Sequence, residues 1–201
     1  TLGRSLYYRY QQLLGEPVEF PENHYQGDYM LQLARDMIQA VGNRHHHAPL
    51  PEVLSEFTTY AAGKILAGIR EDLDSFGVTY DTWFSERSLH DEDAIGKTIA
   101  ALEAAGYVYL HEGAKWFRST AFGDEKDRVV IRANGVSTYF AADLAYHKNK
   151  FERGYDKVVD IWGADHHGYV ERMLAGVQAL GRRRSDLQVI LVQLVNLLRA
   201  G

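Results

Sequence analysis

The stretch from Val158 to Gly181 constrains the fold most, because it joins a short apolar run, a polar turn and a helical pattern. The run Val158–Trp162 is interrupted only by Asp160, which suits a strand covered on both faces. Apolar residues then recur at helical spacing until Gly181 ends the pattern, namely Val170, Met173, Leu174, Val177 and Leu180. This order of elements predicts an α/β fold with parallel strands.

The turn between these two elements, Asp165–Gly168, carries a carboxylate and two imidazoles, those of His166 and His167. Ligands of open α/β sheets bind outside the carboxyl ends of the strands, so this turn is a candidate site. Three interpretations stay open. The turn could bind a metal ion, bind a nucleotide at the helix start, or only cap the helix through Asp165. Gly163 and Gly168 allow close backbone approach and favour a ligand.

Composition limits the class of protein. The 201 residues are 46% hydrophobic and 24% charged, which suffices for one large or two small domains. A net charge of −5 argues against a generic basic nucleic-acid-binding protein, and the lack of cysteine excludes disulfides and thiolate metal sites. No apolar run approaches the ~20 residues of a membrane span, and the start does not resemble a signal peptide. We therefore expect a cytoplasmic protein without membrane contact.

The remaining periodicities predict a mostly helical first part and a mixed second part. Helices are expected over 2–14, 27–41, 54–76, 91–106 and 138–153, with residues 23–26 leading into the second of them. Strands are expected over 80–85, 107–110, 114–117, 129–132 and 189–194. The apolar stripe Leu54–Phe76 is expected to pack on the two earlier helices. The connection Gly42–Pro51, with the run His45–His47, is interpreted as a solvated loop, with metal binding as the alternative. Both ends of the chain fall within regular patterns, which indicates a piece of a longer protein.

One helix carries a second candidate site. Tyr139 and Asp143 are four residues apart and share a helix face, which His147 continues. A phenol beside a carboxylate suits a planar cation, because a carboxylate can accept two N–H bonds from a guanidinium. The alternative is a surface aspartate beside a half-buried tyrosine.

Several blocks, in order along the whole chain, resemble arginyl-tRNA synthetase of the bacterial type, a class I aminoacyl-tRNA synthetase. They include TLGRSLYYRYQ, PENHYQGDY, WFSE, LEAAGYVY, STYFAADLAYHKNKFERG and IWGADHHGYV. The resemblance implies a helical connective part (1–78), a small α/β insertion with a hairpin (79–135) and the second half of a Rossmann-like catalytic fold (136–201). The family's HIGH-type and KMSKS-type ATP motifs do not occur in the chain, so it is expected to be a central fragment that is inactive alone.

The same resemblance implies the site residues and the partners. L-Arginine would be bound by Tyr139, Asp143 and His166, and the adenosine of ATP by Asp165, His166, His167, Gly168, Val195 and Asn196. No catalytic residue and no metal ligand is implied within the chain. ATP with Mg²⁺ would act as a substrate complex without a tightly bound cofactor, and tRNA(Arg) as partner of a monomeric enzyme. Trp83, Ser85 and Glu86 form a family motif near the acceptor end of the tRNA.

Two functions from other classes remain as alternatives. The Asp-His-His string is similar to that of the DHH phosphoesterases, which are manganese-dependent hydrolases. Those enzymes also need upstream Asp motifs and a GGGH segment, which this sequence lacks. The second alternative is a non-catalytic, synthetase-like tRNA-binding module.

Overall fold

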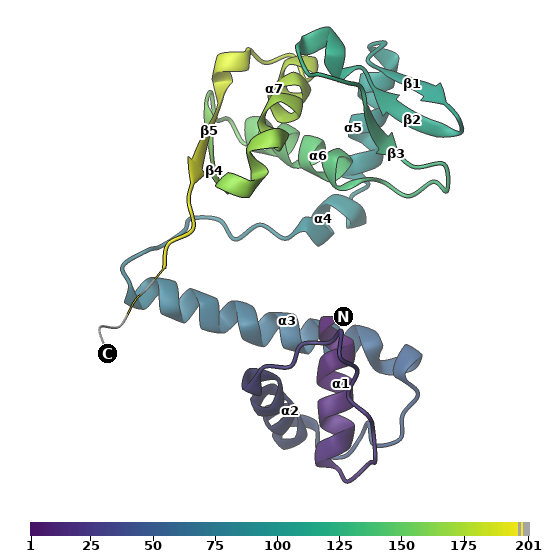
Figure 1. Cartoon of the computed structure of the whole chain (residues 1–201), viewed down its shortest axis with the longest axis vertical. Helices are drawn as coiled ribbons and strands as arrows, with labels where there is room; N and C mark the ends of the chain where they lie inside the picture. Colours follow the sequence, from purple (N-terminus) through teal and green to yellow (C-terminus); the bar gives the residue numbers. More distant parts are fainter. Residues whose placement is uncertain (197, 199–201) are drawn as a thin grey trace. The chain divides into compact units, whose positions relative to one another are not determined.

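The computed structural model describes residues 1–196 and 198, which fall into two compact units, residues 1–82 and residues 83 onward. Residues 197 and 199–201, at the end of the predicted third part, lie outside the described residues. The α/β class predicted from the sequence is confirmed. The elements of the two units are coloured along the chain in Figure 1.

The first unit consists of three helices, α1 (Leu2–Leu13), α2 (Asp28–Val41) and α3 (Leu50–Ser75). Its centre is Tyr10, which is fully buried and packs edge-on against Phe57, with ring centroids 5.3 Å apart. Other fully buried side chains complete the core, namely Leu6, Met30, Ala34, Met37 and Ala61. Apolar residues spaced three and four positions apart thus form the buried faces of these helices, as the sequence predicted.

Only the first half of α3 is buried, so the prediction that its whole apolar stripe belongs to the core was wrong. Phe57 and Ala61 are fully buried, whereas Ile69 is 44% and Phe76 85% exposed. The second half of α3 stays exposed because α3 is longer than the helices on which it packs. At 1.5 Å per residue, the 26 residues of α3 extend about 39 Å, whereas the 12 residues of α1 extend about 18 Å.

Two glycines of this unit give a matched prediction. A Cβ added to Gly3 would lie 2.8 Å from the backbone nitrogen and 2.9 Å from the Cα of Thr58, whereas one added to Gly63 would meet nothing within 4 Å. We expect Gly3→Ala to lower the free energy of unfolding by about 1–3 kcal/mol, because α1 must move away from α3. Gly63→Ala should raise it by about 1 kcal/mol through helix propensity. Denaturant unfolding followed by far-UV circular dichroism measures both, and equal effects would contradict the close approach of α1 and α3.

The second unit contains two sheets. Strands β1 (Val108–His111), β2 (Ala114–Phe117) and β3 (Arg128–Ile131) form an antiparallel sheet, in which β1 and β2 make the predicted hairpin. Its two turn residues, Glu112 and Gly113, both have positive φ, at 49° and 75°. Such a turn matches the twist of the strands that it joins.

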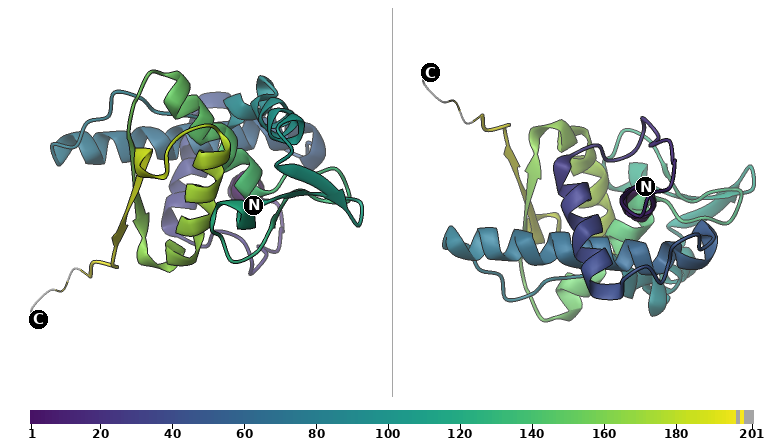
Figure 2. Two further views of the ribbon diagram at one scale, coloured as in Figure 1. Left: turned by 90° about the horizontal axis from the view of Figure 1, so that it is seen from above. Right: turned by 90° about the horizontal axis from the view of Figure 1, so that it is seen from below.

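The second sheet pairs β4 (Val158–Gly163) in parallel with β5 (Leu187–Val192). Helix α6 (Tyr139–Glu152) precedes β4, and the 3₁₀ segment η2 (Ala164–Tyr169) and helix α7 (Val170–Ala179) connect it to β5. Figures 1 and 2 show α6 and α7 between the two sheets. Strand β5 begins two residues before the predicted run 189–194.

Strand β4 is covered on one face only among the described residues, which corrects the prediction of a strand buried on both sides. Val158 and Asp160 are buried, whereas Val159 is 54% and Ile161 71% exposed. On the partner strand, Ile190 and Val192 pair with Ile161 and Gly163 and are also exposed. The helices cover one face of this sheet, and the other presents an apolar surface.

Residues 80–85 form no strand, so that prediction was wrong. The short helix α4 (Glu86–Asp91) follows this stretch, and the sequence did not predict it. Phe84 instead stacks on Tyr146 of α6, with ring centroids 4.3 Å apart. An aromatic run can thus pack one side chain into a core without pairing its backbone.

One hydrophobic core runs through the second unit. It joins residues of α5 (Ala94–Ala104) and the antiparallel sheet to residues of α6, α7 and the parallel sheet, including Ile99, Phe117, Val130, Phe140, Leu144, Met173 and Leu187. Phe117 and Phe140 lie on opposite sides of the predicted boundary at residue 135, with ring centroids 5.9 Å apart. The division of the chain into three parts at residues 78 and 135 stays a prediction.

Two short 3₁₀ segments complete the second unit, η1 (Ser119–Phe122) and η3 (Arg184–Asp186). Across both units, none of the described helices combines the length and the apolar character that a membrane crossing requires.

Candidate functional site

Helix α6 presents the predicted pair to one side of the second unit. Thr138 caps the helix, since its side chain accepts a hydrogen bond from the amide of Ala141. Phe140, Leu144 and Phe151 are buried on the core side, as the spacing predicted. Tyr139 is 74% exposed at the helix start, whereas Asp143, one turn later, is half-buried.

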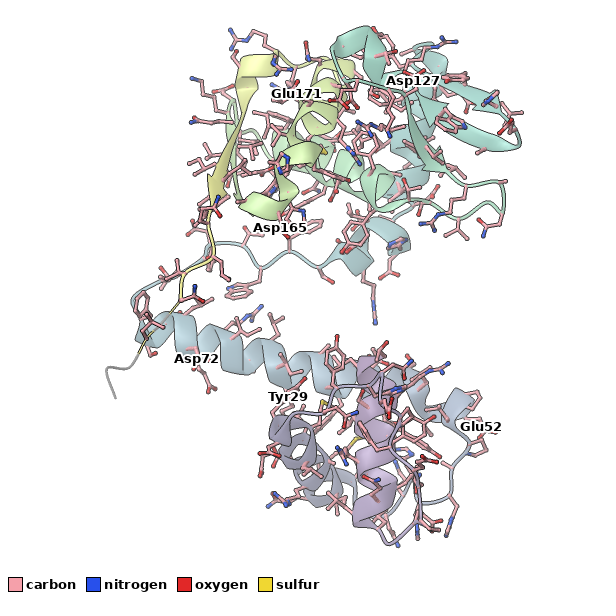
Figure 3. All side chains as sticks on the ribbon, viewed as in Figure 1. Tyr29, Glu52, Asp72, Asp127, Asp165 and Glu171 are labelled. Atoms are coloured by element: carbon pink, nitrogen blue, oxygen red, sulfur yellow. The ribbon has the colours of Figure 1, made fainter. Side chains whose placement is uncertain are left out.

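The turn after β4 faces the same region. Residues 164–169 form the 3₁₀ segment η2 rather than the first turn of an α-helix. Figure 3 shows Asp165 on this segment, beside the end of the parallel sheet. His166 and Tyr169 come from the same segment, and Tyr169 packs edge-on against both Trp162 and Phe140.

A pocket of about 630 Å³ lies between α6, the end of β4 and this turn. Side chains of α6 and of the β4–η2 stretch line it together, including Tyr139, Asp143, Tyr146, Trp162, His166 and Tyr169. Asp143 and His166, far apart in the sequence, therefore share one cavity. Aromatic rings beside a carboxylate suit a ligand with a flat, cationic end.

The hydroxyl of Tyr169 donates a hydrogen bond to Oδ2 of Asp143 over 2.7 Å. Burial raises the pKa of Asp143 above its ordinary value, while this hydrogen bond and the charge of His147 oppose the rise. Burial and the adjacent carboxylate raise the pKa of Tyr169, so its phenol keeps its proton. Asp143 is thus a carboxylate that water solvates poorly and that a cationic ligand would stabilise.

A buried charged group adjoins the pocket. Asp160 of β4 is 6% exposed, and its two carboxylate oxygens accept hydrogen bonds from Nε2 of His147 at 2.7 Å and from Nζ of Lys150 at 2.6 Å. Burial would raise the pKa of Asp160, but these two partners outweigh it and lower the pKa below its ordinary value. Nδ1 of His147 lies 2.8 Å from the carbonyl oxygen of Asp143. Both ring nitrogens of His147 therefore face oxygen atoms that can accept hydrogen bonds.

A second cavity of about 660 Å³ lies beside the ends of β4 and β5. Its lining includes Gly163, Asp165, Val192 and Val195. The predicted site residues therefore line two different cavities. The three residues proposed for arginine line the first pocket, and Asp165 and Val195 line the second. His167, Gly168 and Asn196 are exposed and do not belong to the described lining of either cavity.

Sequence reasoning missed several residues of the first pocket. Tyr169 was not singled out from the sequence, and Asp160 was interpreted only as an interruption of an apolar run. A lone aspartate inside a strand was a usable signal, because buried carboxylates need partners. Glu86 of α4 was named only as part of a motif. It lines an adjoining cavity with Tyr139 and Asp143, and its charge contributes to the raised pKa of Asp143.

Two of the three interpretations of the turn 165–168 lose support. Neither η2 nor α7 has a side-chain capping hydrogen bond, so Asp165 is not a helix cap. Among the described residues, the His and carboxylate groups that converge to metal-binding distances do not include Asp165, His166 or His167. A metal-dependent phosphoesterase centre at this turn is therefore disfavoured.

Comparisons with known proteins agree on one class. No protein-family model matches the chain. Among curated proteins, the chain is 56% identical to the arginine–tRNA ligase of Syntrophotalea carbinolica and 55% identical to that of a Geobacter species. Both similarities cover the whole chain but only 36% of each relative, so the chain spans about a third of their length.

Solved structures agree with this result. A crystal structure from Campylobacter jejuni, whose protein is assigned as arginyl-tRNA synthetase, matches with a TM-score of 0.87 at 39% identity, over 96% of this chain and 42% of that one. The arginyl-tRNA synthetase of Thermus thermophilus matches 94% of this chain and 39% of its own, with a TM-score of 0.57 at 14% identity, which shows the fold alone.

The similarity therefore lies with the aminoacyl-tRNA synthetases, the class in which each of these relatives is named. Within that class, the relatives are arginyl-tRNA synthetases, and the resemblance predicted from the sequence blocks is confirmed along the whole chain.

Proposed function

We propose that this chain forms the arginine-binding part of an arginyl-tRNA synthetase, which activates L-arginine with ATP and transfers it to tRNA(Arg). The observation that carries the proposal is Asp143, a half-buried carboxylate in an aromatic-lined pocket, in a chain that is 56% identical throughout its length to an arginine–tRNA ligase. Such an enzyme is expected to work in the cytoplasm as a monomer.

The pocket suits arginine for a chemical reason. Asp143 can accept guanidinium N–H bonds, and the pairing would remove the cost of burying its charge without a counter-ion. Tyr139 and Tyr146 offer ring faces for the planar group, and Glu86 adds negative charge nearby. His166, which lines the same pocket from the turn after β4, would contact the other end of the amino acid.

The second cavity is the candidate for ATP, which would enter with Mg²⁺ as a substrate complex. Asp165 and Val195 line this cavity, and His167, Gly168 and Asn196 are neighbours of these residues in sequence. The exposed apolar face of β4 and β5 supports the view that residues 136–201 are the second half of a Rossmann-like layer. The chain alone should not form the adenylate, because the HIGH-type and KMSKS-type motifs lie outside its sequence.

A chimera tests the proposal directly. The 201 residues would replace the matching segment of the Syntrophotalea carbinolica enzyme, and arginylation of tRNA(Arg) would be measured. We expect activity within about tenfold of the parent, because a synthetase segment should keep its contacts to the rest of the enzyme. A folded but inactive chimera would favour the non-catalytic binding module.

The contact between Tyr169 and Asp143 gives a second prediction. Tyr169→Phe in the chimera should raise the arginine KM by roughly tenfold, because Asp143 loses a hydrogen bond that orients it and lowers its pKa. Tyr146→Phe is the matched control, since it removes a hydroxyl from the same pocket and leaves the Tyr169–Asp143 bond intact. Equal effects of the two variants would contradict an orienting role of Tyr169.

The raised pKa of Asp143 predicts a pH dependence. Guanidinium binding needs the ionised carboxylate, and burial raises the pKa of Asp143 in the free protein. As pH falls, kcat/KM for arginine should therefore decline at a higher pH than an ordinary Asp, near 3.9, would cause. The Asp143→Asn chimera should lack this acid limb, and an unchanged limb in that variant would assign it to another group.

A further inference from the structure

The loop between α2 and α3 is anchored by hydrogen bonds to side chains of α1, of which Tyr10 and Gln11 are buried. Gln11 is 2% exposed, donates to the carbonyl of His45 at 2.8 Å and accepts from the amide of His47 at 3.3 Å. Tyr7 donates to the carbonyl of Ala48 at 2.8 Å, and Tyr10 to that of Gly42 at 2.7 Å. The loop was expected to be solvated, but it is anchored on both sides of its histidine run.

The three adjacent histidines have different surroundings. His45 is 7% exposed and packs edge-on against Phe57, and its Nε2 lies 3.1 Å from a carboxylate oxygen of Glu56. It therefore points into the protein. His46 and His47 point outward and stack on each other, with ring centroids 3.8 Å apart and planes inclined by 22°.

A carboxylate from another part of the chain meets these two rings. Oε1 of Glu16, just after α1, lies 2.9 Å from Nε2 of His46 and 3.2 Å from Nδ1 of His47. All three ligand atoms lie within 4.8 Å of one another. Bond lengths of about 2.0–2.2 Å in a tetrahedral zinc site separate neighbouring ligand atoms by about 3.3 Å. The two distances from the glutamate oxygen, 2.9 Å and 3.2 Å, are close to that spacing.

We propose that Glu16, His46 and His47 form a zinc-binding site on the first unit, with water as the fourth ligand. Two imidazole nitrogens and one carboxylate are a ligand set that Zn²⁺ prefers. His47 is 67% exposed in its side chain, so an ion and its water can enter. The bound ion would link the end of α1 to the loop between α2 and α3, because its ligands come from both.

A metal-free arrangement would need both rings to donate N–H bonds to the same glutamate oxygen. Such a pair contributes little where one partner is exposed to solvent, as the side chain of His47 is. The backbone of His47, with φ at 60°, also adopts a left-handed conformation that costs a non-glycine residue free energy. A bound ion offsets this cost by giving the converging nitrogens a common partner.

Calorimetric titration of the untagged 201-residue chain with Zn²⁺ tests the proposal. We expect one stoichiometric binding event, weakened roughly tenfold or more by Glu16→Gln, His46→Gln or His47→Gln. His111→Gln is the matched control, because it removes an imidazole that is 57% exposed and lies 3.9 Å from a glutamate oxygen in the other unit. Binding should be unchanged in that variant.

Co²⁺ provides an independent readout of geometry, since a tetrahedral N/O site gives visible absorption that should appear with the wild-type chain and vanish in the His46→Gln/His47→Gln double variant. Far-UV circular dichroism in chelator should be the same for all variants, which separates loss of ligands from loss of fold. Stoichiometric zinc binding that survives in the double variant, or its absence from the wild-type chain, would overturn the proposal.

Discussion

Asp143→Asn in the chimeric enzyme is expected to raise the arginine KM by roughly 30-fold to a few thousand-fold. Removing one partner of a hydrogen-bonded charge pair costs about 2–5 kcal/mol, and each 1.4 kcal/mol is a factor of ten. The substitution keeps the size of the side chain and an oxygen that can accept from Tyr169, so the change reports the lost negative charge. Arginine-dependent kinetics at saturating ATP and tRNA measure it.

Stability should respond differently from arginine binding. Because the folded protein raises the pKa of Asp143, the ionised form is disfavoured by folding at neutral pH, and that cost grows as pH rises through this pKa. Asp143→Asn should therefore leave the free energy of unfolding unchanged or higher.

Glu152→Ala, on the exposed end of the same helix, is the control for the kinetic measurement, and it should leave the arginine KM unchanged. A near-normal KM for Asp143→Asn would refute the assignment of Asp143 to the guanidinium.

The second large effect concerns stability. Asp160→Ala is expected to lower the free energy of unfolding of the second unit by about 3–5 kcal/mol, because it leaves His147 and Lys150 without their buried counter-charge. All three tryptophans, Trp83, Trp116 and Trp162, belong to this unit, so tryptophan fluorescence in urea reports its unfolding specifically.

Lys148→Ala provides the control for this measurement. Lys148 pairs with Glu152 on the same helix, but both side chains are exposed, so we expect a loss of about 0.5 kcal/mol or less. The stabilisation from Asp160 should also depend on pH. Its folded-state pKa is lowered, so the contribution is present above the unfolded-state pKa and disappears as pH falls toward the folded-state pKa. Equal losses for Asp160→Ala and Lys148→Ala would show that the buried group contributes little.

Long, strongly periodic segments were predictable from the sequence. Helices α1, α2, α5 and α6 follow their apolar spacing, and the hairpin follows from Glu112–Gly113. The sequence could not show that α3 extends beyond α1 and α2, because the burial of its residues depends on the length of the neighbouring helices. Nor could it show that residues 80–85 form no strand, since strand pairing depends on segments that are distant in sequence.

The same distinction applies to the site. Tyr139 and Asp143 were found because residues four apart on a helix share a face, which is local geometry. Tyr169 and Asp160 were missed because their partners are 26 residues and 13 residues away in sequence. The zinc proposal has the same origin, since Glu16 and His46 are 30 residues apart. Contacts of this kind depend on the tertiary fold.

The continuous core of the second unit limits how this segment can be recombined. Phe117 contributes to the core from the antiparallel sheet, and Phe140 contributes to it from α6. Residues 83–135 and the residues that follow them would therefore each expose apolar side chains to water without the other part. Swapping residues 83–135 alone between relatives should therefore yield poorly folded hybrids unless the facing positions of α6 and α7 are exchanged as well. Substitutions at the core positions where the antiparallel sheet meets α6 and α7 are expected to arise in compensating pairs.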